Sequence, residues 1–164
     1  MKKIILILFP IVIIVVGFLV LKSENPDQII NTKKEPLAFE DNQVQCPQCN
    51  MFLVGQKYTA QVVTKKGKTH FFDDVGCMVL WIEKNVKDES SLVKWVYTLD
   101  SNKWLKSNKA FYSINDSTPM HYGFGAYEKS TDKTISFEDM RLRMLRGENM
   151  TNPKIRKKIL GENN

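Results

Sequence analysis

The sequence predicts an α+β protein in which two small pseudo-repeated ββαβ-like units follow an N-terminal transmembrane helix. Three observations lead to this prediction. An uncharged apolar run occupies residues 4–21. Two strand-like segments, an apolar helical stripe and a returning strand then follow one another between residues 58 and 99. The second half repeats the same order more loosely.

The apolar run at residues 4–21 is flanked by Lys2, Lys3 and Lys22 and is long enough to cross a hydrocarbon core as a helix. No small-x-small cleavage site follows it, which favours an uncleaved signal anchor over a cleaved signal peptide. Lys2 and Lys3 predict a cytoplasmic N-terminus. We therefore expect residues 1–22 to cross the inner membrane once and residues 23–164 to face the oxidising periplasm.

Residues 23–43 are polar, contain two prolines and are interpreted as a linker to a domain that spans residues 44–147. β-Branched and aromatic residues predict strands at 58–64 and 69–72, with a turn at Gly67 between them. Asp73 and Asp74 supply a helix N-cap. The helix that follows has apolar residues at helical spacing, and residues 93–99 alternate like a strand. The stripe comprises Val75, Met78, Val79, Ile82 and Val86.

The second unit is predicted from strand-like residues at 110–114 and 122–127 and from a helix over 136–145 with Ser136 as its N-cap. Residues 148–164 form a basic tail in which Pro153 begins a short amphipathic helix. This helix either is a solvated tail or docks on anionic lipid or an acidic partner.

The formal net charge is +6, but the excess lies at the two ends of the chain, and residues 23–140 are slightly acidic. A broad phosphate-binding face is therefore not expected, and nucleic acid is excluded as a partner. We find no Ser/His/Asp constellation and no pair of activated carboxylates, so an enzyme is not expected.

The sequence Cys46-Pro47-Gln48-Cys49-Asn50-Met51 concentrates the soft ligands. Two thiolates with a thioether suit Cu(I) better than zinc, and the His pair or second Cys-x-x-Cys of a structural zinc site is absent. A thioredoxin-like redox motif would lie between a strand and a helix, whereas this one follows a linker. A structural disulfide between Cys46 and Cys49 remains the alternative.

A second soft segment contains Pro119, Met120 and His121, whose thioether and imidazole can both bind Cu(I). Cys77 falls on the predicted first helix and is interpreted as a small buried residue, and Met78 as part of the core.

These motifs, in this order, resemble the NosL family, the accessory proteins of nitrous-oxide reductase. The resemblance covers residues 46–127 and includes the segments that begin at Phe71 and Thr118. It implies two related α+β units and a Cu(I) chaperone that supplies the copper–sulfide centre of the reductase. The Cys-x-Met of the family falls on Cys49 and Met51, and its Pro-Met on Pro119 and Met120.

The resemblance also implies apo nitrous-oxide reductase and its maturation and ABC-transporter machinery as partners. The chain departs from the family in three places. It has no lipid-bearing cysteine after the apolar run, Asn50 stands where glycine is frequent, and the tail after Gly147 is basic and helical where the family pattern returns to a strand.

We therefore expect one Cu(I) to be held by Cys49, Met51 and Met120, with Cys46 or His121 completing the site or exchanging in it. Two other functions stay open. A thiol-disulfide oxidoreductase would use Cys46 and Cys49 as its redox pair. A purely structural membrane-anchored protein would bind no metal.

Overall fold

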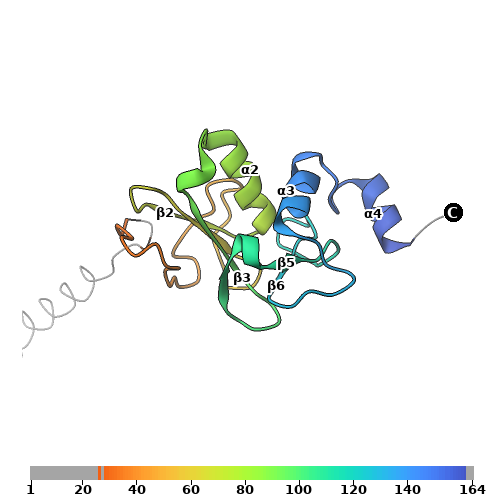
Figure 1. Ribbon diagram of the computed structural model, residues 1–164, viewed down its shortest axis with the longest axis horizontal. Helices are drawn as coiled ribbons and strands as arrows, with labels where there is room; N and C mark the ends of the chain where they lie inside the picture. Colours follow the sequence, from red (N-terminus) through yellow and green to blue (C-terminus); the bar gives the residue numbers. More distant parts are fainter. Residues whose placement is uncertain (1–25, 27, 162–164) are drawn as a thin grey trace, which may run out of the picture.

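An antiparallel four-stranded sheet forms the first half of the molecule (Figure 1). The computed structural model describes residues 26 and 28–161. The sheet has the order β2-β1-β3-β4. Its strands are β1 (Ala60–Val63), β2 (Thr69–Phe72), β3 (Val93–Tyr97) and β4 (Trp104–Lys106). β1 pairs with both β2 and β3, so all four of its residues are buried.

Helix α2 (Val75–Asn85) covers one face of this sheet. The face carries Phe72, which lies opposite Ala60 in the register and packs against Trp81 of the helix at a ring distance of 5.6 Å. The carboxylate of Asp74 accepts a hydrogen bond from the backbone N–H of Gly76 and so caps the helix. Such a cap contributes about 1 kcal/mol to stability. The cap places the start of α2 directly after the end of β2.

The opposite face of the sheet is covered by the segment before it. Gln61 exchanges two hydrogen bonds with the backbone of Leu37, and the indole of Trp95 donates to the carbonyl of Lys34 at 2.9 Å. Phe39 packs edge-on against Phe71. Residues 31–39, all of them within the segment interpreted as a linker, therefore pack on the sheet, and ordered packing starts before Cys46.

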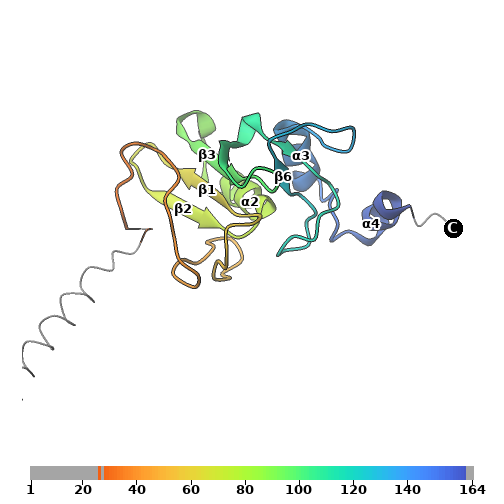
Figure 2. The same cartoon turned by 90° about the horizontal axis from the view of Figure 1, so that it is seen from below.

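The second half contains a two-stranded sheet and two helices. Strand β5 (Phe111–Tyr112) pairs with β6 (Ala126–Tyr127). The helices are α3 (Phe137–Leu145) and α4 (Pro153–Leu160). Short 3-10 turns η1 (Glu89–Ser91) and η2 (Ser107–Lys109) lie in the connections. α3 packs beside α2, and α4 lies beyond α3 at the far end of the molecule in both views (Figure 2).

The two halves share one core across a close contact between Gly76 and Tyr122. A Cβ added at Gly76 would lie 2.4 Å from Cδ2 of Tyr122 and 3.1 Å from the sulfur of Met144. Tyr112, Phe124 and Met140 are fully buried in the second half of this core. Because each large apolar side chain contributes about 1.5–3 kcal/mol on burial, the junction is part of the folded unit.

The structure confirms the predicted α+β class and the ββαβ order of the first half. Strand β4 was not predicted, because Trp104-Leu105-Lys106 is too short to show a period. Ser136 caps α3 as expected, by accepting a hydrogen bond from the N–H of Asp139. Within residues 26 and 28–161 no helix combines the length and the apolarity needed to span a membrane. The predicted anchor at residues 1–22 lies outside the described residues.

Candidate metal centre

The loop that carries Cys46 and Cys49 is closed by its own backbone. The N–H of Cys46 donates to the carbonyl of Met51 at 2.8 Å, and the N–H of Asn50 donates to the carbonyl of Cys46 at 2.9 Å. Asn50 has a φ of 63°, a left-handed conformation that asparagine tolerates better than most residues. Its carbonyl accepts a further hydrogen bond from the side chain of Gln45. This turn directs both thiols toward the start of α2.

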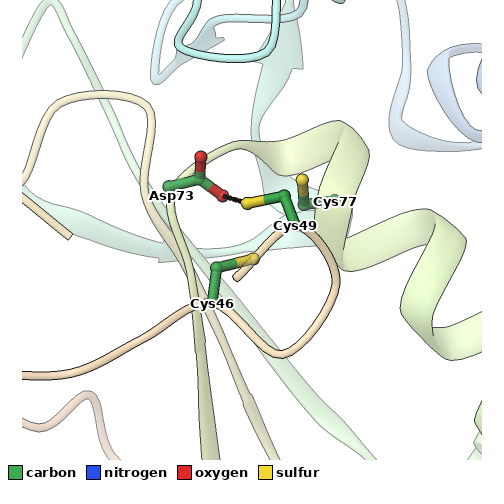
Figure 3. Close-up of side chains that lie close together, drawn as sticks. All are labelled: Cys46, Cys49, Asp73 and Cys77. Atoms are coloured by element: carbon green, nitrogen blue, oxygen red, sulfur yellow. Dashed lines mark hydrogen bonds between the residues drawn. The ribbon is translucent and has the colours of Figure 1, made fainter. Parts of the chain in front are cut away.

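Two residues from the strand-to-helix junction meet the loop. Asp73 directly follows β2, and Cys77 lies in the first turn of α2 (Figure 3). The donor atoms of Cys46, Cys49, Asp73 and Cys77 all lie within 4.8 Å of one another. The thiol of Cys49 donates to Oδ1 of Asp73 at 3.1 Å. Three sulfurs and one carboxylate thus converge from two segments that are far apart in the sequence.

The centre is largely enclosed. Cys46 and Cys77 are 0% exposed and Asp73 is 4% exposed, while Cys49 is half-buried. Oδ2 of Asp73 is buried and has no hydrogen-bond partner among the described residues. An unpaired buried carboxylate oxygen costs about 1–3 kcal/mol or more, and a bound cation would offset that cost. Cys49 is therefore the thiol through which the centre meets solvent.

The three thiols differ in acidity. A hydrogen bond from the Cys77 thiol lowers the pKa of Cys46, and the same bond, together with burial, raises the pKa of Cys77. Burial raises the pKa of Cys49 to about 12, and the hydrogen bond to Asp73 acts in the same direction. The hydrogen bonds and the burial therefore favour negative charge on the sulfur of Cys46 over the sulfurs of Cys49 and Cys77.

These pKa differences among the three thiols do not suit a thiol-disulfide enzyme. The attacking thiolate of such an enzyme has to be both acidic and accessible. Here the acidic thiol, Cys46, is 0% exposed, and the accessible thiol, Cys49, has a raised pKa. The arrangement can hold a metal ion, which would displace the thiol protons when it binds.

A small pocket leads to Asp73. It has a volume of about 140 Å³ and is lined by the side chains of Met51, Phe52, Val54 and Pro119 among others. Met51 is 45% exposed, and Phe52 and Val54 are more exposed still. Met51 thus lines the same pocket as Asp73, and its backbone carbonyl takes part in the turn.

The second predicted soft segment is placed differently. Met120 is half-buried against the core, and its backbone N–H donates to Oδ2 of Asp74 at 3.1 Å. His121 is exposed, has a φ of 56° and lines a separate pocket with Asp116 and Arg156. Among the described His, Cys, Asp and Glu side chains, His121 does not belong to the group of close donors.

The sequence reasoning thus identified Cys46 and Cys49 and missed Asp73 and Cys77. Cys77 was expected to be a small buried residue, and it is buried, but its sulfur faces the other thiols. The signal that could have found both residues is the spacing Asp-x-x-x-Cys across the strand-to-helix junction. An aspartate before a helix and a cysteine in its first turn can point to one site.

The four donors fit two kinds of ion. Three thiols with one carboxylate complete the tetrahedral set that Zn(II) prefers, and two or three thiols alone suit Cu(I). Neither a scan against protein-family models nor a search of the curated proteins gives a match for this chain.

Proposed function

We propose that the protein is a periplasmic Cu(I)-binding metallochaperone that holds its cargo at Cys46, Cys49 and Cys77. The observation that carries the proposal is the convergence of three sulfurs in a largely buried centre. Thiolates favour Cu(I) over harder cations because both are soft.

The charge of the centre also supports a monovalent cargo. A single thiolate at Cys46 neutralises one Cu(I), whereas Zn(II) needs one further negative charge, which Asp73 or a second thiolate would have to supply in the buried site. Cys49 and Cys77 hold their protons more tightly than free thiols. Asp73 is the feature that favours Zn(II), because its oxygen is a hard donor. Zn(II) binding is therefore the second candidate function.

The proposal includes the biological role that the NosL resemblance implies. The chain would be anchored by residues 1–22 in the inner membrane, with its two α+β units in the periplasm. It would deliver copper for the copper–sulfide centre of nitrous-oxide reductase, together with the maturation and ABC-transporter machinery of that enzyme. The order of the Cys-x-Met and Pro-Met motifs supports this role. Such a chaperone needs no acid–base catalysis.

The test is an anaerobic titration of the full chain in detergent, with Cu(I) or Zn(II) supplied against a chromophoric chelator. We expect one Cu(I) per chain, bound more tightly than Zn(II), and a large loss of affinity in Cys49→Ser. Met78→Leu is the matched control. Met78 is buried next to Cys77 on α2 and carries sulfur, but it has no thiol. Unchanged Cu(I) binding in Cys49→Ser contradicts the proposal.

A second measurement separates the proposed role from metal binding alone. Cu(I)-loaded protein is mixed with apo nitrous-oxide reductase, and copper transfer is followed by the spectrum of the reductase. Binding without transfer would contradict the delivery role. Tighter binding of Zn(II) would establish a zinc site instead, and binding of neither ion would support the purely structural alternative.

A further inference from the structure

Helix α4 concentrates positive charge at one end of the molecule. Its eight residues, Pro153–Leu160, include Lys154, Arg156, Lys157 and Lys158 and no acidic residue. All four cationic side chains are exposed. None of them takes part in an ion pair within the part of the chain that the structure describes. The charge of this helix is therefore not neutralised by the rest of the described protein.

Three of these cations share one face. Lys154, Lys157 and Lys158 have the spacing i, i+3, i+4, which places them side by side along a helix. We call them the cationic face. Ile155 and Ile159 lie on the other side of the helix and are half-buried, while Leu160 is 48% exposed at the C-terminal end. The three lysines of the cationic face are thus exposed, while the two isoleucines of the same helix are only half-buried.

The position of α4 leaves the cationic face accessible. In both views the helix lies beyond α3, at the end of the molecule away from the four-stranded sheet (Figures 1 and 2). The helix begins with the side chain of Asn152 as N-cap and Pro153 in the first turn, and it ends at Gly161 with a φ of 72°. Both ends are therefore set by local signals that do not need a protein partner.

We propose that the cationic face of α4 docks on the surface of an anionic lipid bilayer. Charge complementarity carries the proposal, because each Lys or Arg held near an anionic membrane strengthens binding by about fivefold. The exposed Leu160 adds apolar area at the edge of the face. This inference does not depend on copper binding.

The composition of the face favours lipid over an acidic protein. Interfaces between proteins are enriched in aromatic residues and arginine, and arginine binds a fixed carboxylate through two parallel hydrogen bonds. The cationic face has lysines only, and α4 has no aromatic residue. Lysines with flexible stems suit a diffuse surface of negative charge, which offers no single carboxylate to recognise.

The experiment measures hydrogen exchange of the amides of α4 in the full chain, reconstituted in vesicles. One set contains phosphatidylcholine alone, and the other contains equal parts of phosphatidylcholine and phosphatidylglycerol. Anchoring by any other segment is the same in both sets. We expect exchange in α4 to slow at least about fivefold in the anionic vesicles. The effect should disappear near 1 M salt, where the screening length is about 3 Å.

Two triple variants with equal charge loss give the control. K154Q/K157Q/K158Q removes the cationic face and should abolish the slowing. K65Q/K66Q/K68Q removes three exposed lysines from the turn between β1 and β2 and should keep it. Glutamine is a good helix former, so α4 is retained in the first variant.

Equal exchange of α4 in both kinds of vesicle overturns the proposal. Loss of the slowing in both triple variants also overturns it, since the attraction would then come from net charge alone. Slowing by soluble polyglutamate but not by anionic vesicles would assign the face to an acidic protein.

Discussion

The two soft segments of this chain, residues 46–51 and residues 118–121, both carry side chains that can bind Cu(I) but take different places in the structure. The first is a closed turn whose two thiols face Asp73 and Cys77. The second uses a backbone N–H to bind Asp74, and its imidazole is exposed in another pocket. Neighbouring ligand-type residues therefore form a site only when the backbone turns them toward a common point.

The largest expected effect is on the thiols. Cys46→Ser and Cys77→Ala should each lower Cu(I) affinity by more than the 10–100-fold that loss of an outer-shell partner causes. Chelator competition measures this, and thermal unfolding of the metal-free chain checks that each variant folds. If Cys77→Ala binds Cu(I) like the parent, Cys77 is a core residue and the first segment binds without α2.

Asp73→Asn separates the two candidate ions. The variant keeps the shape of the side chain and removes the negative charge beside Cys49. We expect Zn(II) affinity to fall about 10–100-fold and Cu(I) affinity to change much less, because a carboxylate is a hard ligand. Paired titrations with the two ions measure the ratio. An equal loss for both ions would mean that Asp73 acts through Cys49 and not as a ligand.

Gly76→Ala tests the close contact between the start of α2 and Tyr122, the residue that directly follows the second segment. The added Cβ would overlap the ring of Tyr122, so we expect a loss of about 1–3 kcal/mol in the free energy of unfolding, although alanine is the better helix former. Urea unfolding measures the loss. In a protein that already carries Tyr122→Ala, Gly76→Ala should no longer lower the free energy of unfolding. Purely additive effects of the two substitutions in this double-mutant cycle would contradict a direct contact.

Asp74 binds the second segment through the N–H of Met120, and its protonation makes stability depend on pH. Burial raises the pKa of Asp74 to about 6, above its usual value of 3.8. The folded protein therefore holds a proton that the unfolded chain has lost between about pH 4 and pH 6. The stabilisation is complete below about pH 4 and is lost as the pH rises toward 6.

Asp74→Asn should remove this dependence. The difference in unfolding free energy between parent and variant should change by about 1–2 kcal/mol between these pH values, as measured by urea unfolding without metal. Asp88→Asn is the control, because a hydrogen bond from Ser90 lowers the pKa of this exposed cap and gives a dependence of the opposite sign below about pH 4, where its stabilisation is lost as the pH falls. If both substitutions changed the pH dependence of the unfolding free energy in the same direction, the assignment of this dependence to Asp74 would be contradicted.

The smallest effects are expected in the second segment itself. His121→Ala and Met120→Leu should change Cu(I) affinity by about threefold or less, because one side chain is exposed elsewhere and the other packs on the core. The same chelator competition measures both. A loss near that of Cys46→Ser would restore Met120 or His121 as a ligand and break the contrast between the segments.

Much of the first half could be predicted from the sequence, because its signals are local. The β-branched and aromatic residues of β1 and β2, the glycine at the turn and the Asp74 cap each act within a few residues. The place of Cys77 could not be predicted in this way. Cys46 and Cys49 reach it only because their loop folds over the end of β2, a contact between segments distant in the sequence.

Contacts between distant segments also explain why the sequence did not predict that residues 31–39 pack on the sheet. Its polar residues and prolines resemble a linker, but Asn31 and Leu37 bind groups on the sheet that no local pattern reveals. Asp73 was read only as part of a helix cap, because two adjacent aspartates before a helix already have an explanation. Asp74 alone makes the cap, which leaves Asp73 for the thiols.

The closed turn at residues 46–51 has a consequence for the speed of metal exchange. Its frame consists of hydrogen bonds within the protein, from Cys46 to Met51 and from Asn50 to Cys46, so the thiols are positioned by the fold itself. A site organised in this way needs little loss of chain entropy when an ion arrives. Departure of the ion likewise leaves the polypeptide folded. Repeated loading and unloading can then proceed at the pace of ligand substitution, without a folding step in each cycle.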